Sequence, residues 1–453
     1  MISRTTALAL AISAAFVAPA MAQTTVADLQ RAAEQAIQAA NQAVKAAADA
    51  QRAADQANQA LRDLQAATAK AASAPAPAPA AAPAAASSTG GLTITSGANS
   101  ATLYGLIDLT ITHVNNLNVA RESRTSYQPA PWFSGSRWGL TGKRDLGDGL
   151  RVVFRLESEF ITNTGEEDAA GILFGRDAWA GFESDTFGKL SFGRQNALGR
   201  DFAAGYLDPY GAAAASTNEG GGTNTNNFKQ LIFYGGSATG TRYDRGVVWK
   251  KVFGSGLVAG LGYQFGGVVG NRSTNSTQTA ALAYNGGAFN VAGFINSADV
   301  NKLKHNSYSI GGNYTLGLVR INGGFFHYTA EQGVGGALPK RSDKAATLSA
   351  TFAPGGKIDY QIGYQVMSAS RAGFSGSGAT ANTLAAYADT SALTTFAGGQ
   401  RKTVYGSIFY HFDRATEVYV AADKLSLNGG YRQRGTAGAL DQTEFGLGLR
   451  TRF

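Results

Sequence analysis

Few side chains in this 453-residue sequence are arranged for catalysis. The four histidines, His113, His305, His327 and His411, form no HExxH motif and no closely spaced metal-ligand set. Cysteine is absent, which excludes a thiol nucleophile and a cysteine-ligated zinc site. No GxSxG, P-loop or GxGxxG sequence occurs in a strand-to-helix context. The sequence predicts no enzyme, no metal and no cofactor, although a Ser/His/Asp set assembled only in space stays open.

Charged side chains instead alternate with apolar ones at the period of a β-strand. Apolar residues at positions 150, 152, 154, 156 and 160 alternate with Arg151, Arg155, Glu157 and Glu159. In a soluble sandwich the apolar face of such a strand is core and the charged face meets solvent. In a transmembrane barrel the apolar face meets lipid and the charged face lines a pore. The alternation then places Arg155 in the pore.

Similar windows recur from Leu92 to the end of the chain. We expect sixteen strands, at about 101–114, 135–145, 149–161, 172–184, 187–194, 242–252, 256–266, 277–285, 288–297, 306–316, 318–329, 343–353, 357–368, 401–412, 415–427 and 441–453. Tight connections such as 145–149 alternate with long ones such as 114–135, 196–241, 328–343 and 369–400. Residues 229–235 are a possible extra strand, which we place inside the loop 196–241. This pattern is typical of outer-membrane barrels.

Composition and the C-terminus agree with a barrel. The mean hydropathy is only −0.12, and no mature segment reaches the roughly 20 apolar residues of a membrane helix. Alternating strands hide hydrophobicity from such an average. The last strand ends on Phe453, in phase with its apolar face. A closed barrel must pair its last strand with its first, which gives the chain a reason to end there.

The N-terminal quarter differs from the rest in composition. Residues 1–22 combine Arg4, an apolar run and an Ala-Met-Ala cleavage site, which predicts a signal peptide rather than a short membrane anchor. Residues 23–72 contain no Gly or Pro and are rich in Ala and Gln. Residues 73–91 are rich in Pro, Ala, Ser and Gly, which favours an extended linker. The barrel domain is then 92–453.

An apolar heptad seam runs through residues 23–72. It starts at Val26 and Leu29, continues through alanines and ends at Leu61 and Leu64. A sustained heptad predicts a left-handed coiled coil, while a lone alanine-rich helix with a seam by chance is the alternative. Alanine buries little area, so the seam needs a partner or a tether.

Residues 92–453 resemble the general trimeric porins of Gram-negative outer membranes. The matching segments, in family order, are ATLYGLID from Ala101, SRWGLTGKRDLGDGL from Ser136, FRLESEF from Phe154, FGRDAWAGF from Phe174, FGKLSFGRQ from Phe187, RYDRGVVW from Arg242, and the terminal Phe453. The resemblance implies a homotrimer of sixteen-stranded barrels in the outer membrane, in contact with its lipid and lipopolysaccharide. Phe453 would be the assembly signal. The resemblance does not cover the segment before Leu92.

The resemblance also implies a constriction. The third long loop, here 196–241, would fold into the pore and carry Asp201, Asp208 and Glu219. Arginines on the facing wall would be Arg137, Arg176 and Arg242, joined by Arg155. The chain carries a net charge of +8. We therefore expect a diffusion pore for small hydrophilic solutes that prefers anions, unless the arginines pair with loop carboxylates and leave little selectivity.

Two other functions compete with a channel. Nucleic-acid binding is not expected, because the basic residues are scattered at strand period and the protein is exported. An adhesin or envelope-tethering protein, with the barrel mainly an anchor, is the stronger alternative. In porins the barrel N-terminus is periplasmic, so the coiled coil would lie in the periplasm. There it would stabilise a trimer or reach peptidoglycan.

Overall fold

The computed structural model describes residues 91–116, 120–127, 132–206, 234–332, 338–375, 393–429 and 440–453. The predicted signal peptide (1–22), coiled coil (23–72, with Val26, Leu29, Leu61 and Leu64) and nearly all of the linker (73–91) lie outside this part. Every described residue belongs to the second of the two units into which the chain divides, Ala81–Phe453. In the described part no helix is long and apolar enough to cross a membrane.

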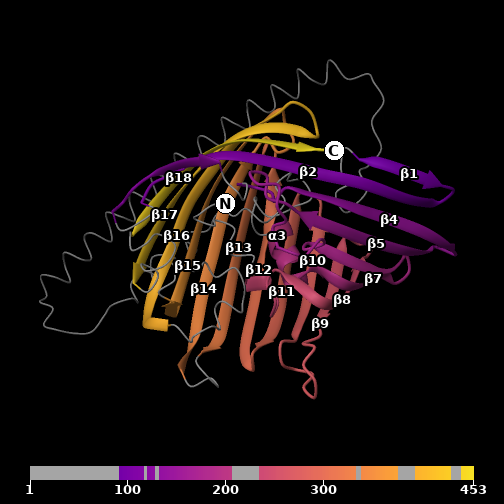
Figure 1. Ribbon diagram of the computed structural model, residues 1–453, viewed down its shortest axis with the longest axis horizontal. Helices are drawn as coiled ribbons and strands as arrows, with labels where there is room; N and C mark the ends of the chain where they lie inside the picture. Colours follow the sequence, from indigo (N-terminus) through magenta and orange to yellow (C-terminus); the bar gives the residue numbers. More distant parts are fainter. Residues whose placement is uncertain are drawn as a thin grey trace, which may run out of the picture. The chain divides into compact units, whose positions relative to one another are not determined.

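Sixteen strands form a closed antiparallel barrel (Figure 1). In order around the ring they are β2 (Asn99–Val114), β4 (Arg137–Gly147), β5 (Leu150–Glu159), β6 (Asp177–Ser184), β7 (Gly188–Asn196), β8 (Arg242–Val252), β9 (Leu257–Gln264), β10 (Thr277–Gly286), β11 (Phe289–Val300), β12 (Leu303–Leu316), β13 (Val319–Gln332), β14 (Leu338–Phe352), β15 (Ile358–Ser375), β16 (Leu393–His411), β17 (Thr416–Gly429) and β18 (Asp441–Arg452). β18 closes the ring by pairing with β2, from Leu106↔Arg452 to Val114↔Glu444. The predicted sixteen-stranded fold is confirmed.

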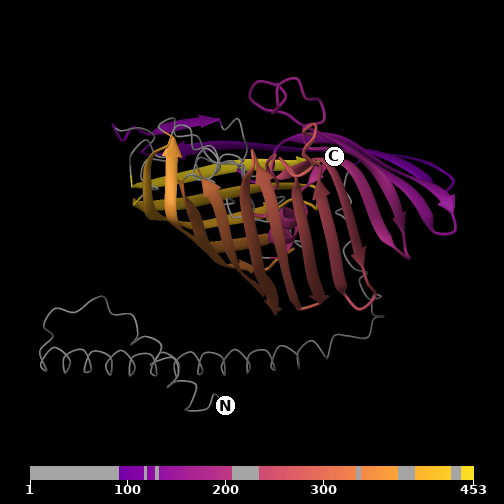
Figure 2. The same ribbon diagram turned by 90° about the horizontal axis from the view of Figure 1, so that it is seen from below.

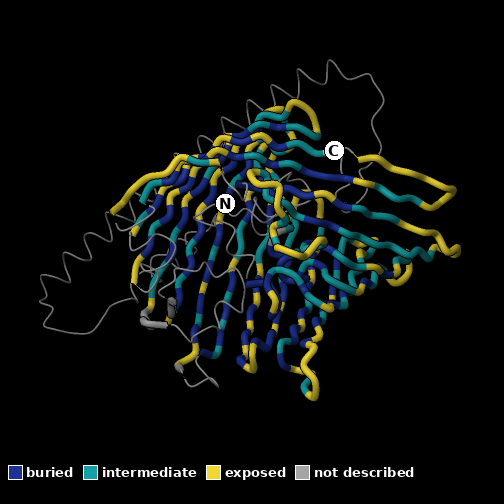
Figure 3. The backbone as a smooth tube through the Cα atoms, viewed as in Figure 1, coloured by how far each residue is buried: buried dark blue, intermediate teal, exposed yellow. Residues whose placement is uncertain are grey.

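The two faces of the wall differ in chemistry, as Figure 3 shows by the alternation of buried and exposed positions along the strands. In β18, Glu444 and Arg450 point inward and are buried, whereas Phe445, Leu447 and Leu449 are exposed on the outside. β15 repeats this pattern with inward glutamines and outward isoleucine and tyrosine. The barrel therefore has an apolar outer surface and a polar, charged interior.

Several strands extend beyond the predicted bounds on the long-loop side. β13 and β14 pair as far as Gln332↔Leu338, and β15 and β16 as far as Ser375↔Leu393. The predicted long connections 328–343 and 369–400 are therefore shorter than expected. β11 and β12 are joined by only Asn301 and Lys302, both with positive φ. The predictions ended where apolar alternation ends, but backbone pairing continues through polar residues.

At β6 the predicted strand was longer than the observed one. Its predicted range began at residue 172, but residues 160–176 form a loop and β6 starts at Asp177. Within this loop Phe160 bridges Glu167, and Arg176 N–H donates to the carbonyl of Glu157. Arg176 therefore sits at the loop end and not in a strand.

Two short strands that the sequence did not reveal complete the sheet around β2. β3 (Arg124–Tyr127) pairs with the C-terminal part of β2. β1 (Leu92–Ser96) pairs with its N-terminal part, from Leu92↔Leu103 to Ser96↔Asn99. On the same edge of β2, Phe453 exchanges backbone hydrogen bonds with Gly105. β1 thus covers the stretch of β2 that projects past the end of β18, where free backbone groups would otherwise remain.

One helix of the loop 196–241 lies inside the ring of strands. α3 spans Leu198–Tyr206 and follows β7 directly. It contacts β9 to β12, and both views place it within the barrel (Figure 2). The family resemblance predicts an inserted loop, but this helix is not expected from the sequence, because the surrounding run of glycine, alanine and asparagine has no helical periodicity.

Candidate channel constriction

Arginines from two strands and from the loop 160–176 surround one carboxylate on the inner wall. Glu157 in β5 lies 2.5 Å from Nε of Arg176 and 2.7 Å from Nη2 of Arg155. Nη1 of Arg137, at the start of β4, lies 3.8 Å from the same carboxylate. The Tyr104 hydroxyl donates to it over 2.7 Å. Arg155 and Glu157 share the inward face because residues two apart in a strand point to the same side.

A second layer of acids extends this cluster. Arg176 also pairs with Glu159, and Nε of Arg155 lies 3.4 Å from Asp177. Burial disfavours the charged guanidinium of Arg176, but the carboxylates of Glu159 and Glu157 outweigh burial and hold its pKa well above the usual range. Arg137 and Arg176 are almost fully buried, whereas the Arg155 side chain is 34% exposed. Of these three arginines, Arg155 is the one that meets water.

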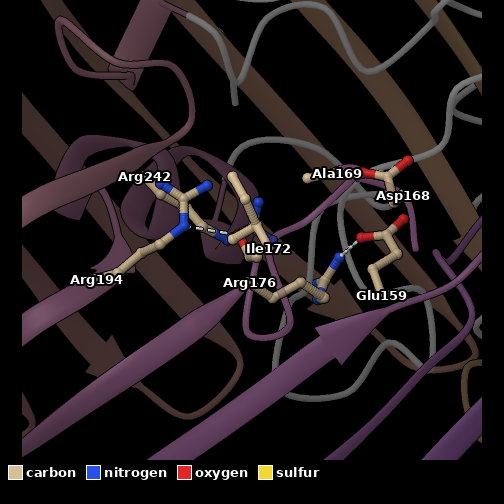
Figure 4. Close-up of a pocket in the computed structure, with 8 residues that line it drawn as sticks. Glu159, Asp168, Ala169, Ile172, Arg176, Arg194 and Arg242 are labelled. Atoms are coloured by element: carbon tan, nitrogen blue, oxygen red, sulfur yellow. Dashed lines mark hydrogen bonds and ion pairs between the residues drawn. The ribbon is translucent and has the colours of Figure 1, made fainter.

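Arg242 lies next to this cluster without a direct ion pair in the described part of the chain. It lines a pocket of about 70 Å³ with Arg176, Arg194, Glu159 and Asp168 (Figure 4). Its Nε is buried and donates no hydrogen bond there. Arg194, by contrast, donates to the carbonyl of Gly175 over 2.7 Å and pairs with Asp244. Arg242 therefore supplies a positive charge that has no ion-pair partner of its own among the described residues.

Helix α3 is held against the opposite part of the wall by apolar contacts. Leu198 and Phe202 are buried with Phe294 of β11, among inward alanines of β10 and β11. These small side chains leave room for the helix. Burial lowers the pKa of the Arg200 guanidinium on the same helix. Asp201 lies 3.7 Å from Lys250 and 3.8 Å from Arg200.

The returning arm of the loop is fixed separately. The Tyr234 hydroxyl donates to Asp343 over 2.8 Å, and Asp343 also accepts two hydrogen bonds from Arg341 at 2.7 Å. The two arms touch where Gly199 in α3 meets Gly235, since a Cβ on either residue would overlap backbone of the other. The ends of the inserted loop are therefore clamped to the wall and to each other.

A second segment, residues 132–136, also folds inward, and it packs on a part of the wall that α3 does not contact. Trp132 and Phe133 are buried against β16, β17 and β18, where Phe133 contacts Phe409 and Tyr419 at centroid distances of 4.9 and 4.7 Å. Trp132 packs on Gly446, which has no side chain to obstruct the indole. This segment leads directly into Arg137. It approaches the interior from β16–β18, whereas α3 lies on β9–β12.

Hydrogen bonds made by Asp108 and Arg450 hold this inward segment. Asp108 in β2 accepts from the Ser134 N–H over 2.9 Å and from the Tyr419 hydroxyl over 2.6 Å. The Asp108 N–H donates to Ser136 Oγ over 3.0 Å. Arg450 donates to Ser134 Oγ over 3.0 Å. The buried Asp108 thus orients the residues that precede Arg137.

The structure brings some predicted site residues together and separates others. Arg137, Arg155 and Arg176 meet at Glu157, and Arg242 lies beside them. Asp201 is on α3 and lies near Lys250 and Arg200, whereas Arg137, Arg155 and Arg176 pair with wall acids among the described residues. Asp208 and Glu219 lie outside the described residues. The Phe453 ring lies over Gly105 and is 46% exposed on the outer surface.

The sequence did not single out several side chains of this cluster. Alternation places Glu157 and Glu159 on the same face as Arg155, and that parity is a signal that could have pointed to their pairing with arginines. Arg194 and Arg200 occur in or beside matched segments but were not singled out. Asp108 ends the matched segment ATLYGLID, but its partners Ser134 and Ser136 lie 26 and 28 residues further on, so the sequence did not show what it binds.

Comparison with known proteins identifies the class. The chain belongs to the Gram-negative porin family, whose model matches residues 66–430. A curated relative, an outer membrane porin protein of Bordetella pertussis, is 32% identical over 253 residues. That match spans 49% of this chain and 62% of the relative.

Solved structures share the fold. An anion-selective porin from Comamonas acidovorans aligns with a TM-score of 0.59 and 19% identity, over 78% of this chain and 100% of that one. The trimer form of in-vitro folded OmpT from Vibrio cholerae aligns with a TM-score of 0.52 and 18% identity, over 79% of this chain and 100% of that one. At these identities the likeness concerns the fold alone.

Proposed function

We propose that this protein is an outer-membrane porin, a water-filled channel for passive diffusion of small hydrophilic solutes and ions. The observation that carries the proposal is the closed sixteen-stranded ring with an apolar outer face and a charged inner face. An apolar exterior is stable in hydrocarbon, and a polar interior holds water. The channel needs no catalytic step and no cofactor. Family membership favours it over a barrel that serves mainly as an anchor.

The direct test is reconstitution of the purified protein in planar bilayers. We expect discrete conductance steps that grow with salt concentration, because ions cross a water-filled path. Swelling of liposomes containing the protein in small sugars would measure diffusion of neutral solutes. Absence of both signals from correctly folded protein would refute the channel.

We further propose that the pore prefers anions. Arg155 is partly exposed, and Arg242 adds a charge without an ion-pair partner among the described residues. A guanidinium stays charged at any relevant pH, and a narrow low-dielectric passage strengthens its field. The anion-selective relative from Comamonas acidovorans supports the direction of this preference. A reversal potential that reports cation preference would overturn it.

The protein acts, in this proposal, as a homotrimer with a periplasmic N-terminal extension. OmpT of Vibrio cholerae, which shares the fold, has a trimer form. The barrel's first strand begins and its last strand ends on the short-turn side, which supports a periplasmic position for the N-terminal extension. Residues 23–72 would form a coiled coil of about 75 Å, with residues 73–91 as its tether. The rod would strengthen the trimer or contact peptidoglycan.

A further inference from the structure

A group of polar side chains on the inner wall lies away from the arginine cluster at Glu157. Arg320 and Asn322 on β13 lie directly opposite Thr351 and Ser349 on β14 in the sheet register. All four point into the barrel, since the residue between the first two, Ile321, is exposed on the outer surface. The two strands therefore bring one guanidinium, one amide and two hydroxyl groups together inside the ring.

These four side chains are buried and lack hydrogen-bond partners. Their exposed fractions are 6% for Arg320, 1% for Asn322, 4% for Ser349 and 5% for Thr351. Nε of Arg320, both polar atoms of the Asn322 amide and the two hydroxyl oxygens make no hydrogen bond in the described part of the chain. Arg320 makes no ion pair there either. Buried polar groups in folded proteins are nearly always paired, so four adjacent ones without partners point to a ligand that supplies them.

The neighbouring strand shows what satisfies the same side chain at the same height. Asn313 on β12 lies directly opposite Asn322. The Asn313 amide donates to the carbonyl of Tyr206, at the end of α3, over 3.2 Å. Its amide oxygen accepts from Asn290 over 2.8 Å. Asn322, one strand further from the helix, makes neither kind of contact among the described residues.

The chemistry of the four side chains defines the ligand. A guanidinium is always protonated and binds a carboxylate through two parallel hydrogen bonds. An amide and a hydroxyl group both donate and accept, and so do the hydroxyl groups of a sugar. A phosphate dianion would bring a second charge that Arg320 alone does not balance. Because two residues along a strand span about 7 Å, the ligand carries hydroxyl groups several carbons away from its carboxylate.

We propose that these four residues form a binding site inside the barrel for a sugar acid, a carboxylate whose carbon chain carries several hydroxyl groups. The carboxylate lies on Arg320 beside Thr351, and the hydroxyl groups contact Asn322 and Ser349. The inference rests on the proposed function, because the solute reaches this wall through the pore. It adds a solute class and a site to a channel that would otherwise only sort ions by charge.

The test is block of single-channel current by gluconate in planar bilayers at constant potassium chloride concentration. A bound sugar acid occupies part of the pore, so we expect a block that saturates with gluconate concentration. Sorbitol has the hydroxyl groups without the carboxylate, and hexanoate has the carboxylate without the hydroxyl groups. Each should block about tenfold more weakly, because each loses one set of hydrogen bonds. Equal block by either compound overturns the proposal.

Arg320→Gln tests the carboxylate contact. It should weaken block by gluconate about tenfold, the loss of a hydrogen bond to a charged group, and leave the weak block by sorbitol unchanged. Lys143→Gln is the matched control, since it removes one positive charge from the inner face of β4, where Lys143 is exposed. An equal effect of the two variants would show that only the total charge of the pore matters, and would overturn the site.

Ser349→Ala tests the hydroxyl contacts without changing charge. It should weaken block by gluconate about fivefold, the loss of one neutral hydrogen bond, and leave block by hexanoate unchanged. Ser309→Ala is the control, because Ser309 is another buried inner-wall serine without a hydrogen bond in the described chain, further along β12. An equal loss in both serine variants contradicts the site.

Conductance in potassium chloride alone tests the proposed channel separately. If the folded protein does not conduct, the channel is refuted, and titration calorimetry with gluconate then decides the binding site by itself. One gluconate bound per protomer, with weaker binding by the Arg320→Gln variant, supports the site. Absence of gluconate binding overturns it.

Discussion

At the scale of single residues, the arginines of the inner wall fall into two groups. Two are buried and paired with a shared carboxylate, and two are either partly exposed or without an ion pair among the described residues. Arg137 and Arg176 are buried and share Glu157, so much of their field is cancelled locally. Arg155 is partly exposed, and Arg242 lacks an ion-pair partner in the described chain. The sequence motifs do not distinguish these four arginines. Because they differ in exposure and in ion-pair partners, we expect them to contribute unequally to the proposed anion preference.

We predict that Arg242→Ala reduces anion preference more than Arg137→Ala does. Removing Arg242 takes away a charge that has no ion pair of its own in the described chain, whereas removing Arg137 leaves Glu157 paired with Arg176 and Arg155. Reversal potentials across a salt gradient measure both ratios. A larger effect of Arg137→Ala would show that burial does not screen that arginine from the permeating ions.

Glu157→Gln provides the converse prediction. It leaves buried arginines without their shared carboxylate, which costs about 3–5 kcal/mol for a broken buried ion pair. We expect a lower unfolding temperature together with a stronger anion preference, because positive charge is released. Thermal unfolding and reversal potentials report the two effects. Asp185→Asn, at an exposed turn, is the control. Unchanged selectivity after Glu157→Gln would place the cluster outside the ion path.

At the scale of elements, two inward segments are fixed to the barrel by different means. α3 is held by apolar packing and by contact with the returning arm at Gly235. Residues 132–136 are held by the buried carboxylate of Asp108. Each segment is thus anchored to the wall of the barrel at more than one point.

We predict that Gly235→Val separates the two arms and alters single-channel conductance, because its side chain would overlap the backbone of Gly199. The expected result is noisier current with more than one conductance level. Gly205→Ala in α3 is the matched control, since no atom lies near the added methyl group. A single-channel conductance equal to that of the native protein, without added noise, in the Gly235→Val variant would mean that the contact between the two arms does not determine the conductance.

The secondary-structure elements also show which parts of the fold the sequence predicts. Apolar alternation predicted all sixteen barrel strands, because one face of each must be apolar in a membrane. It did not predict the polar upper parts of β13 to β16, where pairing alone sets the strand. It missed α3, since that helix is stabilised by alanines on β10 and β11 that are distant in sequence. The inward segment at Trp132 was hidden for the same reason.

At the scale of the whole molecule, we propose that the barrel and the N-terminal segment have separate tasks. The barrel forms its own closed sheet, and β1 joins the linker to it. We predict that deleting residues 24–91 leaves conductance per channel unchanged but lowers the melting temperature of the trimer. Gel mobility after graded heating measures this. An equal melting temperature refutes stabilisation, and loss of co-sedimentation with cell wall would support tethering.

The position of β1 has a consequence for how the barrel closes. Along one edge of β2, Phe453 is level with Gly105 and Leu92 is level with Leu103, so the two chain segments meet end to end. A last strand that slid two residues too far would run into β1. The short strand therefore occupies the place that a shifted final strand would need, and such a shift would change the stagger on which the tilt and diameter of a barrel depend.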